Sequence, residues 1–158
     1  LIATAASVRS GAYQRSLRQL DPDIAVTAKA CPLFVPLVEN GRFRRGDVVI
    51  ETVAREYLEP LRREGLDTLI LGCTHYPLLT DIIGDIMGPG VTLINTGEEA
   101  AWELKRTLRA MDLLAPEGPA GRATLCASDQ PEHFGSLAAY FLGESLTRPV
   151  QPVDIDRY

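Results

Sequence analysis

The amino-acid sequence predicts an α/β fold with a parallel β-sheet. Short apolar runs typical of buried strands alternate with longer stretches in which apolar residues recur every three or four positions, as on one face of a helix. This alternation favours parallel strands joined by right-handed helical crossovers. With 158 residues, of which 46% are hydrophobic and 23% charged, the chain is long enough to bury a core and to form a concave site.

The N-terminal part is expected to begin with a buried strand at residues 1–4. The sequence has no initiator Met, and we expect it to be a fragment of a longer protein. A helix is predicted at residues 7–20, with Ser7 as its N-cap and a turn at Pro22 after its end. The apolar run at residues 24–28 predicts a second parallel strand.

Residues 31–41 are expected to form an irregular loop, because Pro32, Pro36 and Gly41 disfavour regular structure. The same segment is rich in apolar residues, so we expect it to pack inward. Loops held in this way often line a pocket.

A helix is predicted at residues 47–64, where apolar residues keep the three-four spacing. Pro60 is expected to bend its last turn, and Gly65 to end it. A buried strand at residues 68–71 follows.

This strand leads through residues 72–77 to an apolar helix at about residues 78–87, where Pro77 suits the first turn. Residues 91–94 predict another strand. Thr96 and Glu99 form a T-x-x-E capping box, which predicts a helix from residue 96 to about residue 114.

Residues 115–121 are the best candidate for a linker, because they include two prolines and two glycines. Beyond them we expect a strand at residues 124–127, a helix at residues 132–142 and an extended segment at residues 149–155.

The charge balance argues against nucleic acid as a partner. Sixteen Lys and Arg against twenty-one Asp and Glu give a net charge of -5, which repels a phosphate backbone. The densest basic group, Arg42, Arg44 and Arg45, is expected to be a solvated turn. No apolar run approaches the ~20 residues of a membrane-spanning helix, so we expect no membrane insertion.

The three cysteines, Cys31, Cys73 and Cys126, are too few and too far apart for a disulfide framework or a C-x-x-C zinc or redox site. Free thiols in a reducing cytoplasm are expected, with Cys31 and Cys126 as packing residues. No metal site is expected, because the only histidine besides His75 is His133, on the surface of a predicted helix.

The strongest candidate site follows the strand at residues 68–71, because ligands of open α/β sheets bind at the carboxyl ends of the strands. Cys73, Thr74 and His75 lie there. The nearby helix N-terminus is expected to lower the pKa of the Cys73 thiol below ~8.5, so that it acts as a base or nucleophile. His75 would handle protons beside it, and the Thr74 hydroxyl with neighbouring N–H groups would hold a substrate carboxylate. A structural interpretation stays open, with Cys73 as a small buried hydrophobe and His75 bonded to a carbonyl.

Two interpretations of Glu39 also stay open. This carboxylate closes the apolar loop. It is either solvated or placed at the pocket edge, as a partner for a substrate ammonium group or for His75.

The segment Leu71-Gly72-Cys73-Thr74-His75-Tyr76-Pro77-Leu78-Leu79 resembles the second-lobe signature of glutamate racemase, in the cofactor-independent aspartate/glutamate racemase superfamily. Further segments resemble the same family in the same order: residues 4–13 and 30–39, Tyr57-Leu58 with Pro60-Leu61, and residues 96–100 and 128–134. The resemblance therefore covers nearly the whole chain. His75 favours glutamate as the substrate, because the aspartate racemase branch usually carries Glu at this position. Ser7 and Asn95 depart from the family, which often has Thr and usually has Asp there.

The resemblance implies two pseudo-symmetric lobes, each a three-layer αβα sandwich with a parallel sheet, and an active site between them. Residues 1–94 would be the second lobe, which carries Cys73. Residues 95–158 would be the C-terminal segment that completes the first lobe, whose N-terminal part is absent. That absent part would hold the family's first catalytic cysteine and an Asp-Ser pair that binds substrate.

The implied activity is an isomerase reaction that interconverts L- and D-glutamate without a cofactor. It would supply D-glutamate for peptidoglycan, and hence for cell-wall biogenesis and cell shape, in a bacterial cytoplasm. Two cysteines would act on opposite faces of the α-carbon, and Cys73 matches the base for L-glutamate. The resemblance assigns His75 to assist this thiol and, with Thr74, to contact substrate, and it assigns Glu39 to proton handling. The family commonly forms homodimers.

With only one base of the pair present, the chain alone is expected to be inactive. Two alternatives stay open: a racemase of another acidic amino acid such as aspartate, and a non-catalytic carboxylate-binding α/β module. Residues 95–158 are expected to expose apolar surface, so that the isolated chain aggregates or unfolds in part.

Overall fold

The computed structural model describes residues 1–116, 118, 121, 123–143, 146 and 148–157. The chain forms two compact units, Leu1–Leu114 and Ala115–Tyr158. The predicted linker at residues 115–121 begins where the first unit ends. Its residues 117, 119 and 120 lie outside the described part of the chain.

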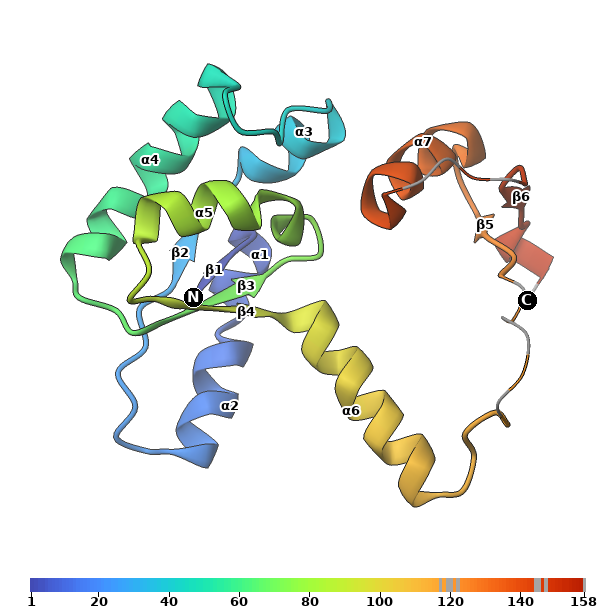
Figure 1. Cartoon of the computed structure of the whole chain (residues 1–158), viewed down its shortest axis with the longest axis horizontal. Coiled ribbons are helices and arrows are strands. Elements are labelled where there is room, and N and C mark those ends of the chain that lie inside the picture. Colours follow the sequence, from blue (N-terminus) through green and yellow to red (C-terminus); the bar gives the residue numbers. More distant parts are fainter. Residues whose placement is uncertain (117, 119–120, 122, 144–145, 147, 158) are drawn as a thin grey trace. The chain divides into compact units, whose positions relative to one another are not determined.

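The first unit is built on a four-stranded sheet with the order β2-β1-β3-β4, and every pair in it is parallel (Figure 1). The strands are β1 (Ile2–Ala3), β2 (Lys29–Ala30), β3 (Thr68–Gly72) and β4 (Thr92–Asn95). Ala3 pairs with Gly72, and Leu71 pairs with Asn95. The carboxyl ends of β1, β3 and β4 therefore meet at one edge of the sheet, and the predicted α/β fold with a parallel sheet is confirmed.

Helices lie on both sides of this sheet, with α3, α4 and α5 on one side and α2 on the other (Figure 1). The helices of this unit are α1 (Ala5–Ser10), α2 (Ala12–Leu20), α3 (Phe34–Glu39), α4 (Val48–Arg63), the 3-10 helix η1 (Tyr76–Leu79), α5 (Thr80–Met87) and α6 (Thr96–Ala110). The exposed Arg42, Arg44 and Arg45 lie in the segment before α4, as expected.

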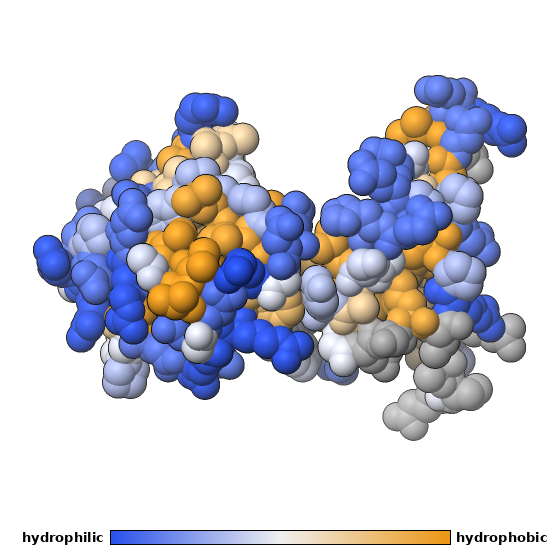
Figure 2. Space-filling view, turned by 90° about the horizontal axis from the view of Figure 1, so that it is seen from above, coloured by the Kyte–Doolittle hydropathy of each residue, from blue (hydrophilic) through white to orange (hydrophobic). Residues whose placement is uncertain are grey.

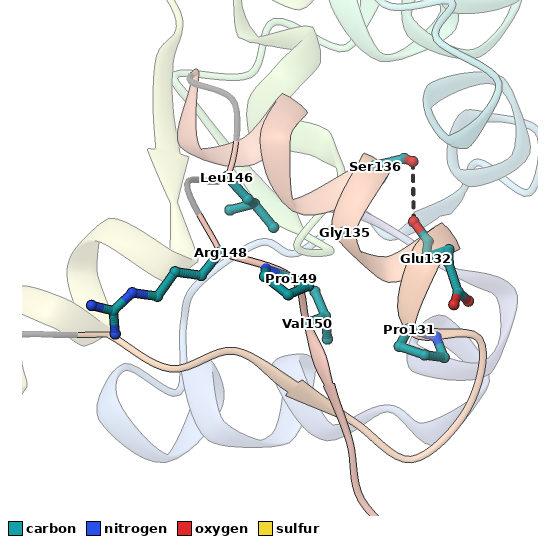
Figure 3. A pocket seen from close by; sticks show the side chains of 8 residues that line it. All are labelled: Pro131, Glu132, Gly135, Ser136, Leu146, Arg148, Pro149 and Val150. Carbon is teal, nitrogen blue, oxygen red and sulfur yellow. Dashed lines mark hydrogen bonds between the residues drawn. The ribbon is translucent and has the colours of Figure 1, made fainter.

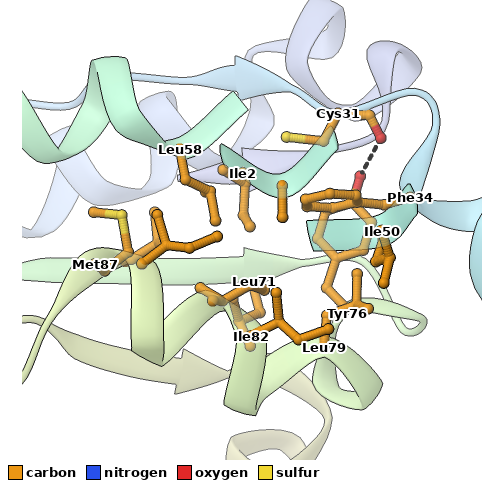
Figure 4. Close-up of a cluster of buried hydrophobic side chains, with 14 of the residues drawn as sticks. Ile2, Cys31, Phe34, Ile50, Leu58, Leu71, Tyr76, Leu79, Ile82 and Met87 are labelled. Atoms are coloured by element: carbon orange, nitrogen blue, oxygen red, sulfur yellow. Dashed lines mark hydrogen bonds between the residues drawn. The ribbon is translucent and has the colours of Figure 1, made fainter. Parts of the chain in front are cut away.

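The core lies between the sheet and α3, α4 and α5 (Figure 4). Leu69 and Leu71 point to this face because they are two positions apart on β3, and Ile2 lies opposite Leu71 on β1. The three-four spacing in α4 supplies the other side through Ile50, Ala54, Leu58 and Leu61, all of which are buried. The helices α1 and α2 contribute no buried residue.

The single helix predicted at residues 7–20 is wrong, because two helices meet at Gly11. Its φ of 63° lies in the left-handed region, which a glycine adopts without strain and which ends the first helix. The N-cap of α1 is also not Ser7. The Thr4 hydroxyl accepts the backbone N–H of Ser7 at 3.3 Å instead.

The strand predicted at residues 24–28 is wrong as well. The second strand is Lys29–Ala30, because pairing with β1 starts where the N–H of Lys29 donates to the carbonyl oxygen of Leu1 at 2.9 Å. The loop predicted at residues 31–41 contains the helix α3. Pro36 is tolerated there because it occupies the first helical turn, whose N–H groups have no partner within the helix. The expected inward packing is confirmed, since Phe34 and Val38 are fully buried.

The prediction of a helix at residues 47–64 is confirmed by α4. Asp47 caps it by accepting the N–H of Val49 at 3.0 Å, and Gly65 follows its end with a φ of 69°. The strands predicted at residues 68–71 and 91–94 are present with small shifts of their bounds.

The second unit contains β5 (Cys126–Ala127), α7 (Pro131–Leu142), β6 (Gln151–Pro152) and the 3-10 helix η2 (Ile155–Arg157), and β5 pairs with β6 in parallel. Cys126 is exposed, so its prediction as a packing residue is wrong; a strand of two residues with one neighbour leaves its side chain in solvent. A surface pocket of about 450 Å³ lies beside α7 (Figure 3). Its lining, which includes Glu132, Ser136 and Arg148, contains no predicted site residue.

Apolar side chains are exposed in both units, as Figure 2 shows for one face of the molecule. Trp102 and Leu104 of α6 are more than half exposed, and so is Leu142 of α7. The expectation that residues 95–158 expose apolar surface is confirmed for the described residues. None of the described helices combines the length and the apolar character that crossing a bilayer requires.

Candidate active site

Cys73, Thr74 and His75 form the turn between β3 and η1, at the carboxyl edge of the sheet. The turn is closed by the N–H of Tyr76, which donates to the carbonyl oxygen of Cys73 at 3.1 Å. The N–H of Leu78 donates to the carbonyl oxygen of His75 at 3.2 Å. These two bonds hold the three predicted site residues at the edge where the sequence places them.

Gly72 allows the turn to begin this close to β1. A Cβ atom on Gly72 would lie 2.8 Å from Cδ1 of Leu1, 3.0 Å from the carbonyl oxygen of Ile2 and 3.1 Å from Cβ of Ala3. Any larger residue would push the two strands apart, so a glycine at the end of β3 is required by space.

The imidazole of His75 joins Cys73 to Glu39. Its Nδ1 lies 3.9 Å from Sγ of Cys73 and 3.4 Å from Oγ1 of Thr74, and its Nε2 lies 3.1 Å from Oε1 of Glu39. The His75 side chain is 19% exposed and that of Glu39 is 36% exposed. Of the two positions considered for Glu39, the structure shows the one beside His75.

This arrangement can transfer protons. A carboxylate at one ring nitrogen orients the imidazole, and when Nε2–H donates to Glu39, Nδ1 keeps a lone pair that can accept the Cys73 proton. The Thr74 hydroxyl lies within reach of the same nitrogen and is exposed at the sheet edge. Thiol, imidazole and carboxylate thus form one chain of polar contacts.

Burial raises the pKa of the Cys73 thiol, so the prediction of a lowered pKa is wrong. The backbone N–H groups of His75 and Tyr76 and the Thr74 hydroxyl lower it, and the charge of Glu39 raises it. Desolvation of the thiolate is the largest of these effects. Burial therefore favours the protonated thiol, and Nδ1 of His75, 3.9 Å from Sγ, is within reach of its proton.

Asn95 and Thr96 lie where β4 ends and α6 begins. The predicted capping box at Thr96 is wrong. The Oδ1 of Asn95 accepts the N–H groups of Gly97 and Glu98 at 3.1 Å and 3.3 Å, so Asn95 is the N-cap of α6. The Thr96 hydroxyl instead donates to the carbonyl oxygen of Leu71 at 3.0 Å and ties β4 to the end of β3. The helix ends at Ala110 rather than near residue 114.

Cys31 and His133 are not members of this chain of contacts. Cys31 is fully buried, and burial raises its pKa to about 12, which fits the predicted packing role. His133 lies on α7 in the second unit. In the part of the chain that the structure describes, no three His, Cys, Asp or Glu side chains are grouped so that they could hold a metal ion.

Sequence reasoning assigned no role to Tyr76, although it follows His75 directly. It is fully buried, and its hydroxyl donates to the carbonyl oxygen of Cys31 at 3.1 Å. The available signal was a tyrosine next to a helix start in an otherwise apolar segment, because a buried tyrosine hydroxyl usually has a hydrogen-bond partner.

Comparison with known proteins shows which proteins this chain is similar to. No protein-family model matches the chain. A glutamate racemase from Mycobacterium ulcerans (strain Agy99) is 45% identical over 155 residues, which span 96% of this chain and 56% of the relative. A glutamate racemase from Geobacter metallireducens is 41% identical over 146 residues, 92% of this chain and 53% of the relative.

The crystal structure of glutamate racemase from Francisella tularensis in complex with D-glutamate has a TM-score of 0.86 and 32% identity, and covers 99% of this chain and 58% of the racemase. This chain is a relative of the glutamate racemases. The Thermus thermophilus racemase in complex with beta-chloro-D-alanine has a TM-score of 0.82 and 44% identity over 99% of this chain and 56% of that racemase. The predicted family resemblance is confirmed, and the chain spans a little more than half the length of each of these racemases.

Proposed function

We propose that the site around Cys73 is one half of the two-base active site of a glutamate racemase. The observation that carries this proposal is the contact chain from Cys73 through His75 to Glu39 at the carboxyl edge of the sheet. The relatives that are named glutamate racemase, and the D-glutamate in one of the related structures, support glutamate as the substrate.

In this proposal His75 takes the proton of the Cys73 thiol, and Glu39 stabilises the resulting imidazolium. The thiolate then removes the α-proton of L-glutamate: the bond from the α-carbon to hydrogen breaks, a bond from sulfur to hydrogen forms, and the electron pair stays on the α-carbon. An acid on the opposite face returns a proton and inverts the centre. Thr74 binds the substrate carboxylate, which is consistent with its exposure beside the turn.

We further propose that residues 1–94 form the second racemase lobe and residues 95–158 the segment that completes the first. The second acid/base would then belong to the first lobe. The product D-glutamate would serve peptidoglycan synthesis in the bacterial cytoplasm, and the intact enzyme would act as a homodimer without a cofactor.

The exchange of the α-hydrogen of glutamate tests this proposal without requiring inversion. The 158-residue chain is incubated with L-glutamate or D-glutamate in heavy water, and the α-hydrogen signal is followed by NMR. A single base on one face can replace hydrogen by deuterium with retention, so we expect slow exchange into L-glutamate and no accumulation of D-glutamate. Cys73→Ser should abolish the exchange, and Cys126→Ser should leave it unchanged.

The same experiment separates the alternatives. Faster exchange with aspartate than with glutamate would identify a racemase of another acidic amino acid. Calorimetric binding of glutamate without any exchange would indicate a non-catalytic carboxylate-binding module. Exchange that survives Cys73→Ser would contradict the proposed base.

A further inference from the structure

The hydroxyl of Tyr76 connects two segments that are far apart in the sequence. Tyr76 begins η1, directly after His75, and its side chain lies in the core, where Figure 4 shows its bond to Cys31. The hydroxyl donates to the carbonyl oxygen of Cys31, 45 residues away, at 3.1 Å. Burial raises the pKa of Tyr76, so the hydroxyl keeps its proton and remains a donor.

Cys31 lies at the start of the segment that carries α3. Its N–H donates to the carbonyl oxygen of Ala3 at 3.0 Å, and its own carbonyl oxygen also accepts the N–H of Phe34 at 3.2 Å. The Phe34 ring meets the Tyr76 ring edge to face, with centroids 5.2 Å apart. Tyr76 therefore holds the N-terminal end of α3 through one hydrogen bond and one ring contact.

Glu39 is the last residue of the same helix. The six residues of α3 form a short rigid rod, about 1.5 Å long per residue, so fixing one end restricts the other. The turn at Cys73 and α3 thus meet twice: through Tyr76 at the start of the helix and through His75 at its end.

We propose that Tyr76 is a positioning residue, whose hydroxyl holds the start of the α3 segment at Cys31 and thereby places Glu39 against His75. This inference deepens the proposed function and rests on it, because the placement of Glu39 affects catalysis only if Cys73 and His75 handle protons. A phenylalanine would fill the same space in the core. The hydroxyl makes the hydrogen-bonded half of the link, which is the half that Tyr76→Phe removes.

The pH dependence of Cys73 alkylation reports the position of Glu39. The titratable groups that face Cys73 in the described structure are Glu39, His75 and Tyr76, and the charge of Glu39 disfavours the thiolate. The 158-residue chain is treated with iodoacetamide at a series of pH values, and each cysteine is quantified by peptide mass spectrometry. Because alkylation is quantified peptide by peptide, the signal of Cys73 is distinguished from those of the buried Cys31 and the exposed Cys126.

We expect Tyr76→Phe to move the Cys73 midpoint to lower pH, by about half a pH unit, because Glu39 then lies farther from the thiol. Glu39→Gln should move it in the same direction. In the double variant the two shifts should not add, because Tyr76 acts through Glu39. Ile83→Val, which trims a fully buried residue on α5, is the matched control for lost stability and should not move the midpoint.

Additive shifts, or a Tyr76→Phe midpoint equal to that of the unmodified chain, would overturn the proposal and leave Tyr76 a purely structural residue. If Tyr76→Phe fails to fold by circular dichroism, Phe34→Leu tests the other half of the link, because it removes the ring contact between Tyr76 and the start of α3. That variant should shift the midpoint only while Glu39 is present. The alkylation needs no turnover of glutamate, so a missing α-hydrogen exchange would count against the proposed function and leave this test intact.

Discussion

The Nε2 atom of His75 lies 3.1 Å from Oε1 of Glu39, although 36 residues separate them in the sequence. The contact joins the turn after β3 to the end of α3. It leaves the other ring nitrogen of His75 on the side of the Cys73 thiol, 3.9 Å from Sγ. One imidazole thus connects a group that can donate a proton with a carboxylate that can stabilise the charge it acquires.

Replacing Glu39 by Gln is expected to lower the pKa of Cys73, because the Glu39 charge disfavours the nearby thiolate. The change should be on the order of half a pH unit. It is measured as the midpoint of thiol alkylation against pH. Glu59→Gln, on α4 beside Arg63, is the matched control and should have no effect. A rise after Glu39→Gln would show that Glu39 acts chiefly by making His75 a better base.

Gly72→Ala is expected to destabilise the first unit by about 1–3 kcal/mol, the usual effect of overpacking. The new methyl group would meet Leu1, Ile2 and Ala3 at 2.8–3.1 Å. Urea unfolding followed by circular dichroism measures the loss. Gly90→Ala adds the same methyl group where nothing lies within 4 Å, so it should be nearly neutral. Equal effects of the two substitutions would contradict the close approach of β1 and β3.

Asn95→Ala is expected to cost about 1 kcal/mol of unfolding free energy, the usual value for a lost N-cap. Its Oδ1 accepts two N–H groups at the start of α6. Asn95→Asp keeps an acceptor at that position and adds a negative charge at the helix N-terminus, so it should retain stability. Thermal melts of the three proteins provide the comparison. An Asp variant as unstable as the Ala variant would argue against this cap.

The raised pKa of Cys31 predicts that stability falls at alkaline pH. The thiol ionises near pH 9 in the unfolded chain and at about 12 in the folded chain. Between these values the unfolded state binds fewer protons, so the unfolding free energy decreases with rising pH by up to about 1.4 kcal/mol per pH unit. The contribution is fully present below pH 9 and is lost as pH rises through 12.

Urea unfolding at pH 8 and pH 10.5 measures this decrease. Cys31→Ala removes the titrating thiol, and its stability should depend less on pH over the same interval. Tyr76, whose pKa burial also raises, adds a decrease of the same sign in both proteins. Parallel pH profiles for the two proteins would contradict the role of Cys31.

Much of the first unit is predictable from local sequence. The helix α4 follows from the spacing of its apolar residues with Asp47 before it, and β3 follows from a short apolar run. The position of Cys73 at the carboxyl edge follows from the strand that precedes it. In each case the deciding contacts lie within a few residues along the chain.

Other features depend on residues distant in the sequence, and local patterns therefore miss them. The strand Lys29–Ala30 is placed by pairing with β1, and α3 forms with Pro36 in its first turn because Phe34 and Val38 are buried against the core. Both Asn95 and Thr96 could cap α6. Asn95 is the cap, because the Thr96 hydroxyl donates to the carbonyl oxygen of Leu71 instead.

The sequence by itself determined the α/β fold class, the strand that presents Cys73 and the resemblance to glutamate racemases. The tertiary structure decided that Glu39 meets His75, that Tyr76 reaches Cys31 and that the pKa of Cys73 is raised rather than lowered. The physical reason is the same for all three. A hydrogen bond between distant segments and the desolvation of a thiol depend on which side chains packing brings together, and no local pattern contains that information.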